Sequence, residues 1–296
     1  MAGDAVGPGG PPDLGSVREV RALLARHGLA PDKSFGQNFL VDRRALAAVV
    51  DAADPPAGAT VLEVGPGLGA LTRVLAERGA RVLALELDGR LLPALRETTD
   101  AFPSVEVRRT DAMRFDHAEM PEGSYLIANL PYQIATALLA EALASRRYRR
   151  MAVLVQREVA ERIVAGPDHT GFGAFSLMCR HWAEARIVRT VAPGCFLPPP
   201  KVTSAIVRLD PRPGVGLDPD TFALIRDGFR HRRKTLRKNL RAAGRDLGAV
   251  DAALAGLGLD PRIRAEALDL GQWRELAARL GPPPGSSSRD ARFPRA

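Results

Sequence analysis

Short apolar runs and helix-periodic segments alternate along the middle of the chain. The runs are rich in β-branched and leucine residues and predict strands, and the segments between them have the three-to-four-residue spacing of amphipathic helices. The expected strands are 60–64, 80–87, 105–112, 124–130 and 151–156, and the expected helices are 70–79, 89–97 and 135–145. Strands and helices that alternate at this spacing are typical of βαβ units. The pattern therefore predicts an α/β fold with a mainly parallel sheet and helices on both faces.

Further along, the pattern changes twice. Residues 185–192 and 202–210 predict two more strands around a proline-rich loop, and these can pair as an antiparallel addition at the sheet edge. After residue 210 a Pro- and Gly-rich linker precedes segments that are only helix-periodic, the first of them continuous over 221–243. We therefore predict a larger, catalytic domain over 17–210 and a small all-helical C-terminal domain over 211–281. The ends at 1–16 and 282–296 are expected to be disordered.

Length and cysteine usage exclude several classes of protein. In 296 residues no apolar run approaches the roughly 18 residues of a membrane span, and the N-terminus lacks the basic and apolar stretches of a secretory signal. The two cysteines, Cys179 and Cys195, form no C-x-x-C pair and have no histidine at ligand spacing, and the five histidines are scattered. We therefore expect no metal site, no disulfide scaffold and a cytoplasmic location.

A glycine-rich sequence, Glu63-Val-Gly65-Pro-Gly67-Leu-Gly69, lies between an expected strand and an expected helix. Glycines there allow a tight turn and let a cofactor approach the backbone. The spacing is G-x-G-x-G rather than the dinucleotide G-x-G-x-x-G, and no Gly-Lys-Ser/Thr follows as a P-loop requires. A glycine turn without any ligand is the structural alternative.

Two acids strengthen the cofactor interpretation. Glu86 and Asp111 end the next two expected strands, where carboxylates can bind the two hydroxyls of a ribose and the amino group of an adenine. A surface or capping acid is the alternative for each. Together with the glycine loop they predict a cofactor that contains adenosine, and at this point NAD and S-adenosylmethionine both remain open.

The tetrapeptide Asn129-Leu130-Pro131-Tyr132 decides between these cofactors. It follows the expected strand 124–130 and resembles the [D/N/S]-P-P-[Y/F/W] motif of S-adenosylmethionine-dependent methyltransferases that act on exocyclic amino nitrogens. The Asn129 side-chain oxygen and the Leu130 carbonyl can accept the two amino hydrogens, which leaves the nitrogen lone pair directed at the methyl group. Pro131 fixes the turn, and Tyr132 offers a face on which the base can stack.

The resemblance extends over nearly the whole chain. Motifs in the order of the ribosomal RNA adenine dimethyltransferase family occur at 33–40 (KSFGQNFL), 63–72 (EVGPGLGALT), 84–88 (ALELD), 129–132 (NLPY), 154–163 (LVQREVAERI), 196–209 (FLPPPKVTSAIVRL) and 232–240 (RRKTLRKNL). The resemblance implies a Rossmann-like methyltransferase that dimethylates adenine N6 in ribosomal RNA with S-adenosylmethionine.

The family has two branches. One modifies two adjacent adenines in the 3′-terminal hairpin loop of small-subunit (16S) RNA during ribosome biogenesis, and the other modifies one adenine of large-subunit (23S) RNA and confers macrolide resistance. GPGLGALT and LDPRIRAEAL resemble the first branch. A small-molecule methyltransferase and a non-enzymatic RNA-binding assembly factor on the same fold are the remaining alternatives. The first predicts no basic helix, and the second predicts loss of the glycine loop or NLPY.

Residue roles carried over from the family follow its motifs. The implied cofactor-binding residues are Asn38, Leu40, Gly65, Gly67, Gly69, Glu86, Asp111 and Asn129. The resemblance also implies that Phe196 stacks on the flipped target adenine, with a buried core residue as the alternative. Gln133 and Ala135 depart from the family pattern, which usually has Asn and Ser there.

The whole chain carries a formal net charge of +8, and its basic residues concentrate near the C-terminal part. At about 100° per residue of a continuous helix, a single stripe would hold Arg230, Arg233, Lys234, Arg237, Lys238 and Arg241. A neighbouring apolar stripe would hold Ile225, Phe229, Leu236 and Leu240. We expect the apolar stripe to pack on the domain and the basic stripe to contact phosphates of ribosomal RNA, with an ordinary solvated face as the alternative. We expect the protein to act as a monomer.

Overall fold

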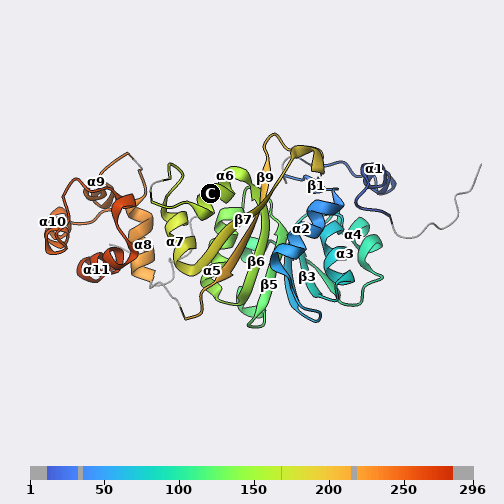
Figure 1. The fold of residues 1–296 in the computed structure, drawn as a ribbon, viewed down its shortest axis with the longest axis horizontal. Helices are drawn as coiled ribbons and strands as arrows, with labels where there is room; N and C mark the ends of the chain where they lie inside the picture. Colours follow the sequence, from blue (N-terminus) through green and yellow to red (C-terminus); the bar gives the residue numbers. More distant parts are fainter. Residues whose placement is uncertain (1–11, 33–35, 168, 215–218, 232, 283–296) are drawn as a thin grey trace, which may run out of the picture. The chain divides into compact units, whose positions relative to one another are not determined.

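A computed structural model of the chain describes residues 12–32, 36–167, 169–214, 219–231 and 233–282 (Figure 1). The described residues divide into two compact units, 12–160 with 186–211, and 161–185 with 212–282. The chain passes between the units after residues 160, 185 and 211, and the boundary expected after residue 210 lies beside the third of these crossings. Residues 161–185, which we had expected in the catalytic domain, belong instead to the second unit, because Phe172 and Leu177 pack in its core.

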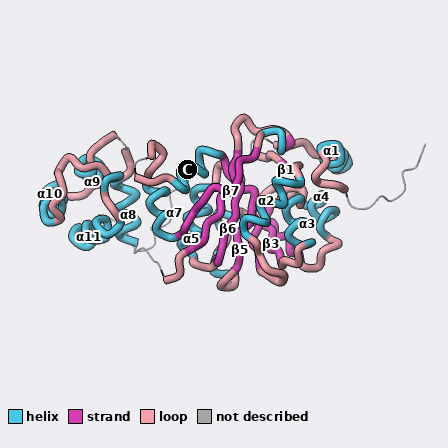
Figure 2. Tube along the Cα trace, in the orientation of Figure 1, coloured by secondary structure: helices cyan, strands magenta, loops and turns pink. Residues whose placement is uncertain are grey.

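The first unit contains a seven-stranded sheet with the order β4-β3-β2-β5-β6-β9-β7 (Figure 2). The strands are β2 (Thr60–Val64), β3 (Arg81–Glu86), β4 (Val105–Arg109), β5 (Ser124–Asn129), β6 (Tyr148–Gln156), β7 (Ala183–Val191) and β9 (Ser204–Pro211). The first five run parallel, and β9 pairs antiparallel with β6. The predicted parallel sheet with an addition at one edge is confirmed.

In addition to this sheet, the first unit contains five α-helices that lie wholly within its described residues. They are α1 (Val17–Arg26), α2 (Arg43–Ala53), α3 (Ala70–Glu77), α4 (Leu92–Thr99) and α5 (Ala135–Ser145). Of these, α2 and α3 share a core with the sheet and α1 packs beside α4. Val49 of α2 and Leu75 of α3 share a fully buried core with Val61, Ile127 and Leu154 of the strands. No described helix is long and apolar enough to cross a membrane.

The first described residues are packed rather than disordered. Leu14 is 5% exposed and belongs to a core cluster with Val20 and Leu91, and the Asp13 carboxylate accepts a hydrogen bond from Arg43. The expected disordered N-terminal segment is therefore wrong from residue 12 onward. Residues 1–11 and 283–296, the rest of the two expected disordered ends, lie outside the described residues.

A small two-stranded sheet brings two distant motifs together. In it β1 (Phe39–Leu40) pairs antiparallel with β8 (Phe196–Leu197), with Leu40 opposite Phe196. The N-terminal GQNFL motif is thereby fixed to the FLPPP motif more than 150 residues later. Residues 33–35 of the first motif lie outside the described residues.

The second unit is helical, as the sequence predicted. Its helices include α7 (Ala174–Trp182), α8 (Pro219–Gly228), α9 (Leu236–Ala242), α10 (Leu247–Gly256) and α11 (Leu270–Leu280), and α6 (Arg157–Val164) leads into it. Its core surrounds the fully buried Trp273 and contains Ile225, Leu236 and Leu240 of the expected apolar stripe. Phe229, the fourth member of that stripe, packs against the core with its ring 5.9 Å from that of Trp273.

The prediction of one continuous helix over 221–243 is wrong, because α8 ends at Gly228 and α9 begins only at Leu236. A Cβ at Gly228 would lie 2.3 Å from the Trp273 ring, so the chain packs closely there. The buried Asn239 amide donates to the carbonyls of Gly228 and His231, at 2.6 and 3.1 Å. These side-chain bonds satisfy carbonyls that a continuing helix would have used, and Thr235 caps the new helix by accepting from the Lys238 N–H.

Candidate active site

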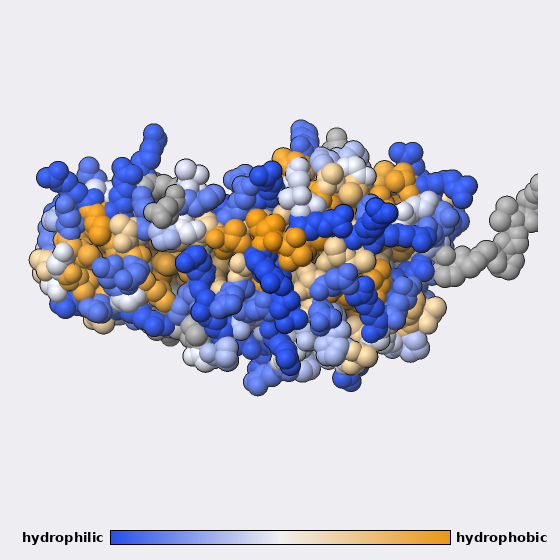
Figure 3. Space-filling model, viewed as in Figure 1, coloured by the Kyte–Doolittle hydropathy of each residue, from blue (hydrophilic) through white to orange (hydrophobic). Residues whose placement is uncertain are grey.

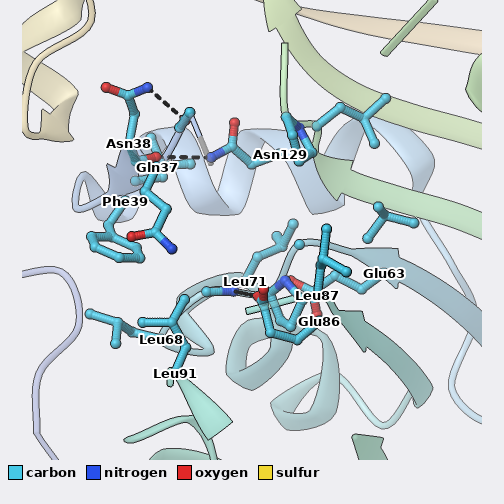
Figure 4. Close-up of a pocket in the computed structure, with 18 of the residues that line it drawn as sticks. Gln37, Asn38, Phe39, Glu63, Leu68, Leu71, Glu86, Leu87, Leu91 and Asn129 are labelled. Atoms are coloured by element: carbon cyan, nitrogen blue, oxygen red, sulfur yellow. Dashed lines mark hydrogen bonds between the residues drawn. The ribbon is translucent and has the colours of Figure 1, made fainter. Parts of the chain in front are cut away.

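A cavity of about 280 Å³ lies in the first unit, at the carboxyl ends of the parallel strands (Figure 4). Val64, Glu86 and Asn129, at the ends of β2, β3 and β5, line it together with Asp111 just beyond β4. The segment 36–40 and the loop 129–134 complete the lining. Ligands bind at this edge in open α/β sheets, so the topology itself marks the cavity as a binding site.

The glycine loop adopts a backbone that other residues disfavour. Gly65, Gly67 and Gly69 all have positive φ, at +68°, +59° and +85°. A Cβ at Gly65 would lie 3.3 Å from Pro131, and one at Gly67 would lie 3.0 Å from the Phe39 ring. The loop therefore needs glycine both for its conformation and for close packing against the other two walls of the cavity.

Glu86 is held rigidly at the edge of the cavity. It is 6% exposed, and its carboxylate accepts hydrogen bonds from the N–H of Gly67 at 3.1 Å and of Asp88 at 2.8 Å. Burial raises its pKa, and these two bonds act in the opposite direction. Each carboxylate oxygen can accept further hydrogen bonds, so the group is suited to bind a pair of hydroxyls.

Glu63 is a second buried carboxyl, which our sequence reasoning did not assign a role. It is 1% exposed and lines the cavity, and among the described residues its Oε2 atom has no hydrogen-bond partner. Burial raises its pKa from 4.5 to about 8, and the nearby charge of Glu86 acts in the same direction. An acid inside the otherwise apolar strand TVLEV was the signal available in the sequence.

Asp111 has a structural role as well as a place in the cavity. Its side chain accepts from the Met113 N–H at 2.9 Å and so caps a 3₁₀ turn over Ala112–Arg114, and it lies 3.6 Å from the Arg114 guanidinium. The capping alternative is thus correct. The same residue lines the cavity, so capping fixes the carboxylate at the position predicted for cofactor binding.

The NLPY loop faces the glycine loop. The Asn129 side-chain N–H₂ donates to the backbone oxygen of Asn38 at 3.3 Å, which leaves its Oδ1 atom available to accept (Figure 4). Leu130 is buried, and its N–H donates to the Leu154 oxygen at 3.1 Å. The Tyr132 hydroxyl lies 2.9 Å from that of Ser204, which fixes the ring beside the cavity. All four residues of the tetrapeptide line the cavity.

A family model and several known proteins match this chain in sequence over most of its length. A sequence model described as ribosomal RNA adenine dimethylase matches residues 30–280. This chain belongs to that family. It is 46% identical to the ribosomal RNA small subunit methyltransferase A of Deinococcus radiodurans, over 95% of this chain and 97% of the relative. It is 36% identical to the protein of the same name from Geobacillus kaustophilus, over 91% and 98%.

Solved structures of the dimethylase family and of related enzymes have the same fold. The 23S rRNA methyltransferase ErmE is 29% identical, with a TM-score of 0.60 over 82% of this chain and 99% of its own. A dimethyladenosine transferase from Plasmodium falciparum is 24% identical, with a TM-score of 0.67 over 79% and 94%. The predicted Rossmann-like methyltransferase fold is therefore confirmed.

Asn38 and Leu40, which the family pattern assigns to the cofactor, both line the cavity. The Asn38 side chain donates to the Gly36 oxygen at 2.9 Å. Phe196 does not line the cavity among the described residues: it is 3% exposed and packs in the core with Val191 and Ile206. The buried-core alternative describes this position, and stacking on a flipped base stays a prediction for Phe196.

The predicted RNA-binding residues of the dimethylase differ in their surroundings. Within the described parts of the chain, Arg230, Arg233, Lys234, Lys238 and Arg241 are exposed and make no ion pair. Arg237 is paired with Asp251 through two hydrogen bonds of 2.5 and 2.8 Å, which raise its pKa. Arg230, Arg233 and Lys234 lie in the turn between α8 and α9, so the predicted stripe on one helix is wrong. The six basic residues instead lie around the start of α9, and we call them the basic segment.

Among the described residues, no group of three His, Cys, Asp or Glu side chains is arranged to hold a metal ion. Cys179 is fully buried, which raises the pKa of its thiol, and neither it nor Cys195 forms a disulfide.

Proposed function

We propose that this protein transfers methyl groups from S-adenosylmethionine to N6 of two adjacent adenines in the 3′-terminal hairpin loop of 16S ribosomal RNA during ribosome biogenesis. The observation that carries the proposal is one cavity lined by the glycine loop, Glu86 and the NLPY tetrapeptide. Relatives that are up to 46% identical over nearly the full chain are named for the small ribosomal subunit, which favours this branch over the large-subunit branch.

The residues of the cavity fit S-adenosylmethionine. Gly65 and Gly67 provide a backbone cradle that a Cβ would fill, Glu86 offers acceptors for ribose hydroxyls, and Asp111 lies one strand further for an adenine amino group. A cationic ligand would favour the ionised form of Glu63 and give its unpartnered oxygen a partner, and S-adenosylmethionine carries positive charge on its sulfonium and ammonium groups. When bound, this cofactor supplies an electrophilic methyl group.

Asn129 prepares the amino nitrogen of the target for attack. Its N–H₂ group is held by the Asn38 carbonyl, so Oδ1 accepts one N6 hydrogen while the Leu130 carbonyl accepts the other. Both bonds favour a pyramidal nitrogen whose lone pair is no longer delocalised into the ring. No strong general base is needed, because the methylated ammonium loses its proton readily. Catalysis therefore rests on positioning.

Tyr132 and the turn around Pro131 hold the base. The Tyr132 hydroxyl is fixed by Ser204, so the ring presents a preset face on which an adenine can stack. The target base must leave its RNA stack to reach the cavity, which favours adenines in a loop over paired ones. A hairpin-loop substrate meets this requirement.

The basic segment of the second unit holds the RNA. Its five exposed and unpaired cations are suited to phosphates, and A-form grooves offer side chains little to read, so selection rests on RNA shape. The glycine loop, the segment 36–40 and the loop 129–134 complete the cavity within the first unit, and we infer that a monomer is active. We also infer that it works in the cytoplasm of a bacterium, where ribosomal RNA is assembled.

Mapping of methylated adenines tests the function. A strain that lacks the gene should lack two dimethyladenosines near the 3′ end of its 16S RNA, as read by mass spectrometry of nuclease fragments, and the wild-type gene should restore them. Loss of a methyl mark in 23S RNA instead would assign the protein to the other branch. Restoration of growth by an Asn129→Ala variant without any methylation would favour the non-enzymatic assembly factor.

A further inference from the structure

Residues Gly36, Gln37 and Asn38 lie across the cavity between its two functional walls. The Gln37 amide donates to the Asp88 carboxylate at 2.8 Å on the side of Glu86. On the other side the Asn38 backbone oxygen accepts from the Asn129 side chain at 3.3 Å (Figure 4). We call these three residues the crossing segment.

Asp88 is the anchor of the crossing segment. It is 4% exposed, and Arg90 donates to both of its carboxylate oxygens, at 2.9 and 2.8 Å. The Arg90 guanidinium keeps the pKa of Asp88 below its ordinary value, so the carboxylate is charged. A charged acceptor makes the hydrogen bond from Gln37 one of the stronger kind.

Gln37 is fixed at a second point. Its side-chain oxygen accepts from the Asp32 N–H at 2.9 Å, and its own N–H donates to the Asp32 oxygen at 3.2 Å. The Asp32 carboxylate in turn accepts from Arg90 at 2.8 Å. Arg90, Asp88, Asp32 and Gln37 thus form one hydrogen-bonded network that holds the crossing segment.

Both ends of this network reach residues that we place in the active site. The Asp88 N–H donates to Glu86 at 2.8 Å, and the crossing segment reaches Asn129 through the Asn38 oxygen. A continuous path of hydrogen bonds and short backbone steps therefore joins Glu86, Asp88, Gln37, Asn38 and Asn129. It connects the carboxylate that would bind ribose with the amide that would bind the target base.

We propose that the Gln37–Asp88 hydrogen bond couples the cofactor site at Glu86 to the orientation of the Asn129 amide, so that Gln37, Asp88 and Arg90 are positioning residues for methyl transfer. The proposal rests on the proposed function for the identity of the two ligands. The path predicts that cofactor occupancy strengthens the hold on the Asn129 amide before the base arrives. Cofactor binding and base positioning are then energetically linked, as coupled sites must be in both directions.

A double-mutant cycle on cofactor affinity tests the coupling. S-adenosylhomocysteine serves as the probe in calorimetry, with the wild type, Gln37→Leu, Asn129→Ala and the double variant. We expect each single change to weaken binding about fivefold and the double variant to weaken it by little more, because either change already breaks the path. Weakening by the product of the two single effects would overturn the proposal.

Turnover gives an independent readout. At saturating cofactor and RNA, Gln37→Leu should slow single-turnover methyl transfer about tenfold and leave RNA affinity unchanged. A purely structural role would lower the melting temperature without this change in rate. Asp88→Asn keeps an acceptor for Gln37 but weakens the pairing with Arg90, so it should slow methyl transfer by a smaller factor. This variant replaces Gln37→Leu in the test if Gln37→Leu does not fold.

Arg108→Ala is the matched control. Arg108 also bridges two acids, Glu106 at 3.0 Å and Glu119 at 2.7 Å, but it does not line the cavity. Its loss should leave S-adenosylhomocysteine affinity and the methyl-transfer rate unchanged, and an effect equal to that of Gln37→Leu would contradict the assigned path. If the wild type methylated no adenine but bound S-adenosylhomocysteine, the proposed function would fail while the binding cycle still tested the coupling.

Discussion

The cofactor cavity and the basic segment place ionisable side chains in opposite surroundings. In the cavity, Glu63 and Glu86 are 1% and 6% exposed, so the few atoms around each carboxyl determine its charge state. In the basic segment the unpaired cations are exposed, and Figure 3 shows hydrophilic side chains over much of the visible surface. Buried charges interact strongly over short distances, whereas exposed ones are screened over about 8 Å at physiological salt. Substitutions in the cavity should therefore have large effects that do not depend on salt. Substitutions in the basic segment should have moderate effects that depend strongly on salt.

The largest effect is expected at Asn129. Asn129→Ala removes a preorganised acceptor of the reacting amino group, so single-turnover methyl transfer should fall by about 10²–10³-fold. RNA affinity should be unchanged, because the amide does not contact phosphates. Quench-flow measurement with a 16S hairpin checks this. A rate within about threefold of wild type, a difference of about 0.65 kcal/mol in barrier, would contradict the role.

The sequence predicted the cavity well because its motifs are local. The glycine loop, Glu86 and NLPY each follow a strand, so knowing the sheet was enough to bring them to one edge. Gln37 and Asp88 were missed because their contact joins residues 51 positions apart, and no local pattern encodes it. Glu63 was missed because its unusual state comes from burial, which only the folded core supplies.

In the second unit, tertiary contacts override the local pattern. Helix periodicity runs through 221–243, yet the chain leaves the helix at Gly228, where the Trp273 ring leaves no room for a Cβ. Asn239 then satisfies the freed carbonyls from eight and eleven residues away. Five of the six predicted basic residues are exposed and Arg237 is paired with Asp251, and their arrangement on one helix was wrong because periodicity assumes a continuous backbone.

Glu63 should make the stability of the cofactor-free protein depend on pH. Its pKa is about 8 in the folded state against an ordinary 4.5, so between these values the folded protein holds a proton that the unfolded chain has released. The contribution of Glu63 to the free energy of unfolding is thus highest below pH 4.5 and falls as the pH rises to 8, by on the order of 5 kcal/mol. Glu63→Gln should flatten the decline in denaturation series between pH 5 and pH 8.5, and an unchanged slope would sink the assignment.

Glu86→Ala should weaken cofactor binding by about 1.5–3 kcal/mol, the scale of hydrogen bonds to a charged group. Because the carboxylate is buried, the loss should be the same at low and at high salt. Calorimetry with S-adenosylhomocysteine measures it, and circular dichroism confirms that the variant is folded. Equal affinity for wild type and variant would remove Glu86 from the cofactor site.

The basic segment should respond to salt in the opposite way. Changing Arg233, Lys234 and Lys238 together to Ala removes three exposed and unpaired cations. If each contacts one phosphate, the slope of log K against log salt for RNA binding should fall by roughly 2–3 units. S-adenosylhomocysteine affinity should not change, because none of the three lines the cavity.

The smallest effect is expected at Arg237, which lies in the same segment but already has a partner. Asp251 accepts two hydrogen bonds from its guanidinium, so RNA phosphates would have to compete with a carboxylate that is in place. Arg237→Ala should therefore lower the salt slope by clearly less than 1 unit, whereas Lys238→Ala, one position away, should lower it by about 1. Filter-binding titrations at several salt concentrations compare the two. Equal slopes for these neighbours would mean that pairing does not decide which cations meet RNA, and that the segment acts only through its total charge.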